Sequence, residues 1–421
     1  MPEVLPFEGI RYSGDRIGDM TRVVVPPYDV ISESERSRMA EEPYSPVRLT
    51  LDPSKPDDTD TDNRYTRSRD LFRSWMTDGI LVRDKEPAYY VLSQEFEWHD
   101  KRFTRRCLVG ACRLHEWSEG IILPHEQILE GPRADRQNLI ETTSANYEPI
   151  FGLALGDDAA FANLLEQSCR TQPLIDARMP NGERHSIWRV ETAENSEFRS
   201  LLTDTRIIIA DGHHRYTASL AVRNRMNSRL GPGPWDYVMM AIAPMDDPGL
   251  LILPTHRIVD GLPALNVTEL LRRLDDLFMC LPIENAGELE EALEKTEGPA
   301  FGMVTREGCH LLVPWNLDDC AAAVRLERSP LWKRLDVAVL HGLIFDRYLG
   351  IGAGESPFLR YTRDAAEAMR AVTENGASLA FLMKATPKES VRQIALGGET
   401  MPQKSTFFYP KLATGLVMRD W

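Results

Sequence analysis

Cysteine is scarce in this sequence, and long apolar runs are missing. The 421 residues include six cysteines, and no two of them form a C-x-x-C pair. This spacing excludes a zinc ribbon and a dithiol redox motif, so we expect buried, reduced thiols. No stretch approaches the ~18 apolar residues that a membrane-spanning helix needs. The first residues lack a basic start followed by an apolar core, so we expect no signal peptide and a cytoplasmic location.

Positive charge is in deficit as well. The chain has 49 Lys and Arg residues against 64 Asp and Glu residues, which gives a formal net charge of −15. Nucleic acids and anionic membranes both attract proteins through a positive field, so this balance argues against either as a partner. A protein of this kind that binds a small anion must do so in a local basic pocket.

The remaining composition is typical of a globular protein. Hydrophobic residues make up 43% of the chain and charged residues 27%. At ~150 residues per domain, the length suggests two or three domains. The sequence contains no internal repeat, no G-x-x-x-x-G-K-[ST] loop and no protein-kinase signature. Those two kinase architectures are therefore excluded.

Helical and strand patterns alternate along the chain, which predicts an α+β (mixed α/β) fold with several sheets. A capping box at Ser32 and Glu35 predicts a short helix, and the acidic stretch 52–64 predicts an exposed loop. The region 120–153 has little periodicity, so we expect a long irregular segment, which is often functional. Further helices are predicted over 64–78, 213–229, 268–278, 287–296, 333–348, 363–375 and 388–396, and strands over 89–98, 102–114, 206–210, 237–243, 300–315 and 378–383, with 206–243 forming a βαβ-like unit.

The sharpest chemical feature is the segment ADGHHRYTASL. A strand that ends at Asp211 and opens a helix just after Gly212 would place backbone N–H groups, His213, His214 and Arg215 at the positive end of the helix. Such an arrangement suits phosphate, since an arginine can hold two phosphate oxygens at once. The alternative is that the two histidines point to different sides and only cap the helix. A paired-histidine metal site is disfavoured, because adjacent helical positions lie ~100° apart.

A second feature is the segment LPHEQIL, which presents His125 and Glu126 after a proline. Glu126 could act as a general base toward a hydroxyl group or as a magnesium ligand. The alternative is a solvated glutamate in a loop.

A third feature is the segment MPQKSTFFYPK, which has no acidic residue. Lys404, Ser405, Thr406 and Lys411 supply positive charge and hydroxyl donors, as an oxyanion site requires. The alternative is a solvated turn.

Together these segments resemble a known superfamily. ADGHHRYTASL resembles the G-x-H-R phosphate-binding box of the ParB/sulfiredoxin superfamily, and LPHEQ, ADGHHR and the K-S-T segment occur in the order found in its free L-serine kinases. The whole chain is also similar to a bacterial and archaeal family long described only as of unknown function, through PPYDVIS, LPHEQ, ADGHHRYTA, LPTHR and MPQKSTFFYPKLATGL. Members of that family are connected with serine phosphorylation, with pyrophosphate among the donors.

The resemblance implies a strand-turn-helix core with parts added on both sides. We expect an N-terminal α/β domain over 1–118, a ParB/sulfiredoxin-like catalytic core over 119–260, and a C-terminal α/β domain over 261–421 whose K-S-T loop returns to the active site. The implied activity is phosphorylation of free L-serine to O-phospho-L-serine, which would feed serine and cysteine metabolism. Pyrophosphate is slightly favoured over ADP or ATP as donor, because we find no purine slot in the sequence.

The resemblance also implies a role for each matched residue. Glu126 would take the proton from the serine hydroxyl, with His125 beside it, and Asp211 would lie at the catalytic centre near Mg²⁺. Gly212, His213, His214 and Arg215 would bind the donor phosphates; Lys404, Ser405, Thr406, Arg133 and Arg136 would bind the substrate or a phosphate; His256 and Arg257 would be further anion ligands.

Two other functions stay open at this point. A phosphoserine phosphatase could use the same anion pocket with water as acceptor. A non-catalytic, ParB-like nucleotide-binding protein would need only the phosphate box.

Overall fold

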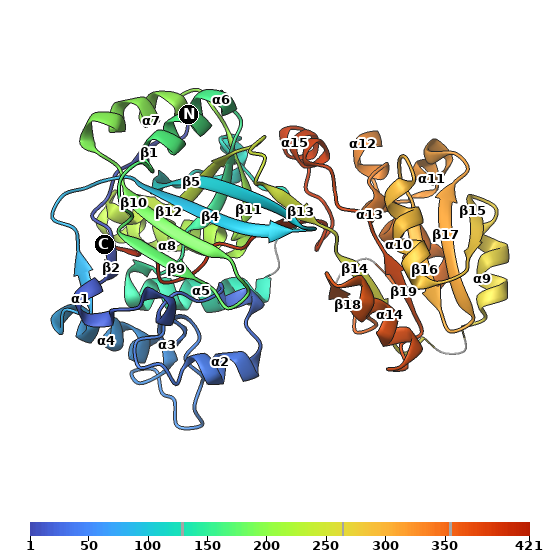
Figure 1. The fold of residues 1–421 in the computed structure, drawn as a ribbon, viewed down its shortest axis with the longest axis horizontal. Coiled ribbons are helices and arrows are strands. Elements are labelled where there is room, and N and C mark those ends of the chain that lie inside the picture. Colours follow the sequence, from blue (N-terminus) through green and yellow to red (C-terminus); the bar gives the residue numbers. More distant parts are fainter. Residues whose placement is uncertain (128–129, 263–264, 353–355) are drawn as a thin grey trace. The chain divides into compact units, whose positions relative to one another are not determined.

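The computed structural model describes residues 1–127, 130–262, 265–352 and 356–421, and the chain forms two compact units (Figure 1). Unit 1 comprises Met1–Pro124, Ile128–Leu251 and Pro410–Trp421, and unit 2 comprises His125–Gln127 and Ile252–Tyr409. Both contain helices and strands, which confirms the predicted mixed α+β class. The three predicted domains and the ParB-like core stay a prediction. Among the described residues, no helix has the length and apolar character to cross a membrane.

Unit 1 is built on a large sheet with the strand order β6-β11-β8-β12-β5-β4-β10-β9, and β1 pairs with β5. The predicted long hairpin is confirmed as β4 and β5, which are joined through His99 and Asp100 at φ values of +48° and +58°. Positive φ at both positions is what a tight hairpin turn requires. The strands are β1 (Val4–Leu5), β4 (Tyr90–Trp98), β5 (Lys101–Arg113), β6 (Ile122–Leu123), β8 (Ile150–Ala154), β9 (Ile175–Arg178), β10 (Arg184–Arg189), β11 (Ile207–Asp211) and β12 (Tyr237–Pro244).

Helices and short strands complete unit 1. Capping boxes at Ser32 and Asn63 begin α2 and α4, so local hydrogen bonds fix two of the predicted helix starts. The elements are β2 (Ile10–Tyr12), α1 (Gly14–Ile17), η1 (Met20–Arg22), η2 (Tyr28–Val30), α2 (Glu33–Met39), α3 (Val47–Thr50), α4 (Arg64–Thr77), β3 (Leu81–Arg83), η3 (Trp117–Glu119), α5 (Glu130–Thr143), β7 (Ala145–Asn146), α6 (Asp158–Gln167), η4 (Thr192–Glu194), α7 (Asn195–Leu202), α8 (His213–Leu230), η5 (Pro234–Asp236) and β21 (Arg419–Asp420).

The predicted βαβ-like unit is wrong in its strand arrangement. Strand β11, helix α8 and strand β12 follow one another as expected, but β8 lies between the two strands in the sheet. β8 pairs antiparallel with β11 and parallel with β12, so β11 and β12 run in opposite directions. The sequence of three elements does not fix their pairing, because β8 and β5, from elsewhere in the chain, are the neighbours of β12.

The region 120–153 is also more regular than predicted. It contains β6, α5, β7 and β8, while Ile128 and Leu129 lie outside the described residues. Polar residues hide the helical period of α5, whose buried Ile140 packs against Ala218 and Val222 of α8. Arg133 and Arg136 are therefore helical residues and do not belong to an irregular loop.

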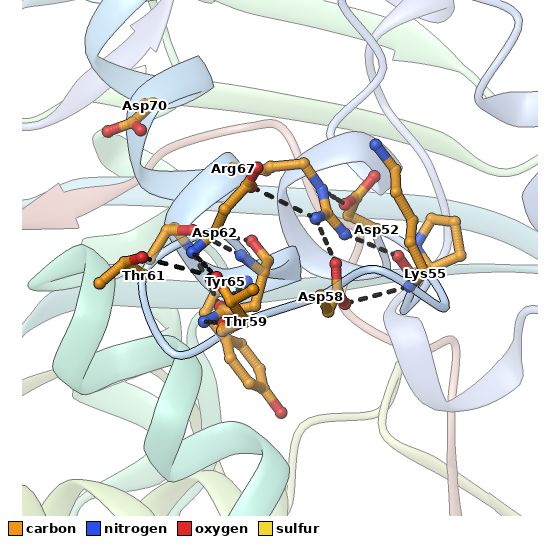
Figure 2. A network of polar contacts seen from close by, with 12 residues as sticks. Asp52, Lys55, Asp58, Thr59, Thr61, Asp62, Tyr65, Arg67 and Asp70 are labelled. Carbon is orange, nitrogen blue, oxygen red and sulfur yellow. Dashed lines mark hydrogen bonds and ion pairs between the residues drawn. The ribbon is translucent and has the colours of Figure 1, made fainter.

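The acidic loop before α4 is organised by one arginine. Figure 2 shows Arg67 of α4 between Asp52 and Asp58, with Nε 2.7 Å from an oxygen of Asp52 and Nη1 2.5 Å from one of Asp58. Asp58 also accepts the Lys55 N–H at 3.0 Å, and Arg67 Nη2 donates to the Pro53 carbonyl oxygen at 3.0 Å. The loop predicted from its composition is thus a folded turn held by its own carboxylates.

Unit 2 contains a second sheet, with the order β15-β17-β16-β19-β14-β18. Helices α10 and α14 pack against it, and their apolar residues form one core with the strands. The strands are β14 (His256–Val259), β15 (Phe278–Ile283), β16 (Phe301–Thr305), β17 (Gly308–Pro314), β18 (Leu359–Thr362) and β19 (Leu379–Leu382), together with β20 (Phe407–Tyr409) outside this sheet and β13 (Leu251–Leu253) at the unit boundary.

The helices of unit 2 follow the predicted order with two differences. Helix α11 (Leu317–Ala323) matches no predicted helix. The predicted helix over 333–348 is divided into α12 (Pro330–Lys333), α13 (Asp336–Val339) and a π-helix, η6 (Leu340–Leu349). A π-helical turn is wider than an α-helical one and is rare, and such turns occur frequently at functional sites. The other helices are α9 (Val267–Leu274), α10 (Ala286–Lys295), α14 (Ala365–Thr373) and α15 (Lys388–Leu396).

Candidate functional site

The predicted site residues form two groups, one in each unit. The group in unit 1, here called the α8 group, surrounds the start of α8; that in unit 2, here called the KST group, surrounds the K-S-T segment. The α8 group comprises Asp211, Gly212, His213, His214 and Arg215 with their partners Glu148 and Lys411; the KST group comprises His125, Glu126, Lys404, Ser405 and Thr406 with their partner Arg257.

The α8 group is built on a strand-turn-helix. β11 ends at Asp211, Gly212 is the N-cap with a φ of +92°, and α8 begins at His213. A Cβ atom on Gly212 would lie 3.0 Å from Nη2 of Arg215, so both the backbone conformation and the close approach of Arg215 favour glycine. The first N–H groups of a helix have no partner inside the helix, and the helix dipole favours an anion there. The predicted phosphate box therefore has the expected backbone form.

Asp211 faces two cations. Its Oδ1 is ion-paired with Nζ of Lys411, and its Oδ2 lies 3.0 Å from Nη2 of Arg215. Burial opposes ionisation, but Lys411 and Arg215 outweigh it and lower the pKa of the Asp211 carboxyl to about 2. Both oxygens already accept from positive groups, so the donor set does not fit a magnesium ligand. In the ranges that the structure describes, no three His, Cys, Asp or Glu side chains are arranged to hold a metal ion.

Arg215 is buried and bound on several sides. Nη1 donates to the Pro149 carbonyl oxygen at 2.7 Å and lies 3.3 Å from Oε2 of Glu148, while Nη2 donates to Asp211. The two terminal nitrogens are thus occupied, whereas Nε is buried and has no hydrogen-bond partner among the described residues. Glu148 is buried too; burial raises the pKa of its carboxyl against the effect of Arg215, and its Oε1 accepts from Thr414 at 2.9 Å.

The two arginines predicted as companions are placed differently. Arg136 lies 4.2 Å above the ring of Tyr28 and donates to the Thr50 carbonyl oxygen at 3.1 Å. The same ring lies 5.9 Å from the guanidinium of Arg215, so Tyr28 connects Arg136 to the α8 group. Arg133 is partly buried on α5, and among the described contacts none joins it to Asp211 or Arg215.

Lys411 is held in place by the hairpin of unit 1. Gln94 of β4 donates from Nε2 to the Lys411 carbonyl oxygen at 2.8 Å, and the fully buried Arg105 of β5 donates to the Pro410 carbonyl oxygen. The Lys411 amine also lies 3.7 Å from Asp29.

Sequence reasoning placed Lys411 in a positive segment but missed its partners. It assigned no chemistry to Tyr28, Asp29 or Glu148, although PPYDVIS contains the first two. That hallmark motif was the signal that could have pointed to them.

The KST group joins two segments that are far apart in the sequence. The Met401 N–H donates to the His125 carbonyl oxygen at 2.8 Å, and the Gln127 N–H donates to the Met401 carbonyl oxygen at 3.3 Å. Two contacts involve side chains. The Lys404 backbone N–H donates to Oε1 of Glu126 at 2.7 Å, and Nε2 of His125 lies 2.7 Å from Oγ1 of Thr406. His125–Gln127 and the K-S-T segment thus lie in contact within unit 2.

Hydrogen bonds also fix the conformation of the K-S-T segment. Lys404 has a φ of +57°. Oγ of Ser405 donates to the Pro402 carbonyl oxygen, and Oγ1 of Thr386 donates to the Ser405 carbonyl oxygen at 2.7 Å. The segment is a defined turn in which Ser405 is buried and Lys404 is exposed.

His256 and Arg257 do not fit the role of anion ligands. Nδ1 of His256 accepts the Met383 N–H at 3.0 Å, and burial with the neighbouring Arg257 charge lowers the pKa of His256 to about 4, which makes it neutral at physiological pH. Arg257 is 1% exposed and donates from Nη2 to the Lys404 carbonyl oxygen at 2.9 Å. Both side chains bind protein backbone.

Comparisons with known proteins give one family and several similar structures. The family model described as "Protein of unknown function (DUF1015)" matches residues 4–338. A search of curated proteins gives no match. Similar solved structures include a conserved hypothetical protein from Pyrococcus furiosus (18% identity, covering 72% of this chain and 91% of that chain, TM-score 0.35) and a free serine kinase in complex with AMP (17%, 71% and 88%, 0.36). A C-terminally truncated SbnI from Staphylococcus aureus is another (13%, 73% and 86%, 0.36).

The predicted resemblance to free serine kinases is confirmed in that such a kinase is among the similar structures. Because these TM-scores are low, the activity of this chain is inferred from its own residues.

Proposed function

The chain belongs to the DUF1015 family of proteins of unknown function, and we propose that it is a kinase that phosphorylates the hydroxyl group of free L-serine. The observation that carries the proposal is the contact between His125–Glu126 and the K-S-T segment. The Glu126 carboxylate accepts the Lys404 N–H there, and the neighbouring His125 contacts the Thr406 hydroxyl. A base next to groups that can orient an amino acid is what a serine acceptor requires. One of the similar solved structures is a free serine kinase with bound AMP.

In this proposal the KST group serves the acceptor. Glu126 takes the proton from the serine hydroxyl, whose oxygen forms a bond to the transferred phosphorus. The Lys404 N–H holds Oε1 of Glu126 at 2.7 Å, and Oε2 lies 3.9 Å from Nε2 of His125. Ser405, Thr406 and the Lys404 amine are proposed to bind the serine or its phosphate.

The α8 group serves the donor. As the new bond forms, the bond from phosphorus to the leaving phosphate breaks, and negative charge grows on the leaving oxygen. The helix N-terminus, His213, His214 and Lys411 would neutralise that charge, while Arg215 fixes Asp211 in place. Magnesium would be held mainly by the donor phosphates, as is common for this ion, because Asp211 already faces two cations.

The identity of the donor is part of the proposal. Pyrophosphate comes first, with ADP and ATP next, and the product O-phospho-L-serine would feed serine and cysteine metabolism. The cytoplasmic location stays a prediction.

A donor screen tests the proposal. The full chain is incubated with L-serine, magnesium and either pyrophosphate, ADP or ATP, and phosphoserine is measured by ³¹P NMR, with the Glu126→Gln variant as a control for contaminating kinases. We expect phosphoserine with at least one donor from the wild type, and far less from the Glu126→Gln variant. No product with any donor would overturn the proposal. Phosphate release from phosphoserine without an acceptor would indicate a phosphatase, and nucleotide binding without product would indicate a non-catalytic protein.

A further inference from the structure

The backbone of Lys404 is held in an uncommon conformation. Its φ of +57° lies in the left-handed region, which lysine seldom adopts. From this conformation its N–H reaches Oε1 of Glu126. Residues in such conformations persist where their surroundings over-determine them, and they cluster at functional sites.

Arg257 fixes the other side of the same residue. Its Nη2 donates to the Lys404 carbonyl oxygen at 2.9 Å, so both peptide groups next to the Lys404 Cα atom are held, one by Glu126 and one by Arg257. Nη1 of Arg257 donates to the Thr255 carbonyl oxygen, and the ring of Tyr361 lies 5.6 Å from Cζ. The guanidinium therefore spans β14 and the K-S-T segment within unit 2.

The charge of Arg257 is unusual for a residue that is 1% exposed. Burial lowers the pKa of its guanidinium to about 10, so the group is still charged at neutral pH, and Glu126 is one of the groups that stabilise this charge. A buried cation is unfavourable unless it is paired and hydrogen-bonded, and an apolar side chain could fill the same position in a strand. The attraction to Glu126 accounts for a charged arginine at this buried position.

His341 supports the guanidinium from the π-helix η6. Its Nε2 lies 3.4 Å from Nε of Arg257, and its ring packs at 70° against Phe345, with the centroids 4.9 Å apart. Burial and the nearby Arg257 charge lower the pKa of His341 to about 3, so the ring is neutral and can accept the Arg257 N–H. The wide helical turn thus places a neutral acceptor where Arg257 needs one.

We propose that Arg257, supported by His341, is a positioning residue that sets the Lys404 backbone and through it the orientation of Glu126. This inference rests on the proposed function, in which Glu126 is the base. Arg257 itself touches neither the serine nor the donor.

The kinetic test compares Arg257→Met with the matched control Arg360→Met. Arg360 lies opposite Ile258 in the β14–β18 pair, is half exposed and pairs with Asp260. We expect Arg257→Met to lower kcat about tenfold and to raise the serine KM, with the donor KM within twofold of wild type. In a Glu126→Gln background the same substitution should lower the residual kcat less than twofold, because the base it positions is gone. Equal losses in both backgrounds, or an unchanged kcat, would overturn the inference.

Amide exchange tests the same inference without an assay. In protein labelled with ¹⁵N-lysine, we expect the Lys404 amide to exchange at least threefold faster in Arg257→Met and in Glu126→Gln, and at the wild-type rate in Arg360→Met. An unchanged rate in Arg257→Met overturns the positioning role even if the kinase proposal holds. A wild type without any phosphoserine overturns the kinase proposal, while exchange still decides whether Arg257 holds Lys404. If Arg257→Met does not fold, Arg257→Lys replaces it, since lysine keeps the charge but cannot span the same acceptors.

Discussion

The two groups of candidate residues are stabilised in different ways. In the α8 group, side-chain charges neutralise one another: Arg215 and Lys411 share Asp211, and Arg215 also pairs with Glu148. In the KST group, backbone groups hold one carboxylate, and a buried arginine holds the backbone. The stability of the first arrangement therefore depends on the charges of its side chains and on pH. The geometry of the second depends on the backbone conformation of Lys404.

The largest effect is expected from Glu126→Gln, which keeps the shape of the KST group but removes the proposed base. We expect kcat to fall by about 10²- to 10⁴-fold, the usual contribution of a general base, with donor affinity within twofold of wild type. Initial rates and calorimetric titration with the donor measure the two quantities. Glu307→Gln, in the exposed turn between β16 and β17, is the matched control. Full turnover in Glu126→Gln would show that Glu126 is not the general base.

The next effect concerns the charges of the α8 group. Arg215→Met leaves the buried Glu148 and the partly buried Asp211 without their shared partner, so we expect the free energy of unfolding to fall by about 3–5 kcal/mol. Adding Glu148→Met should recover a large part of that loss, because the buried charge is then removed as well. Urea denaturation measures both variants.

Arg225→Met provides the control for that experiment. Arg225 lies on the same helix, pairs with Glu141 and is about half exposed, so its loss should change stability by less than about 1 kcal/mol. Equal stabilities of Arg215→Met and Arg225→Met would show that the α8 group does not depend on its buried ion pairs.

The smallest effect is a pH dependence. The folded pKa of Asp211, about 2, lies below its ordinary value of 3.8, so the carboxylate contributes stability above pH 4 and loses this contribution as pH falls toward 2. The difference in unfolding free energy between wild type and Asp211→Asn should therefore shrink by about 2 kcal/mol over that range. Urea denaturation at pH 6, 4 and 2 follows the change. A difference that stays constant would contradict the charge-based account of this group.

Local signals in the sequence predicted much of the fold. The capping box at Ser32, the hairpin at His99 and Asp100, and the strand-turn-helix at Gly212 depend on residues close in sequence, and each is present. Strand order depends on distant residues. No sequence signal near β11 and β12 predicts that β8 lies between them, so the predicted βαβ-like unit was wrong.

The candidate site follows the same division. Glu126 and Lys404 are separated by 278 residues, and only the resemblance brought them together before the structure did. The partners of Arg215 could not be predicted, because the guanidinium was matched to a phosphate whereas Glu148 and Asp211 occupy it. Charge balance inside a buried group is a property of three-dimensional neighbours, which a motif does not contain.

The segment Pro410–Trp421 has a consequence for biosynthesis. It belongs to unit 1, where Met418 pairs with Ile10, Thr414 pairs with Val25, and β21 pairs with β7. A ribosome delivers these residues after all of unit 2, so their pairs with Ile10, Val25 and β7 cannot form before unit 2 has been synthesised. Until then, the first residues of unit 1 lack their backbone pairs with this segment. The part of unit 1 that is synthesised first is therefore completed by a short segment that is synthesised after unit 2.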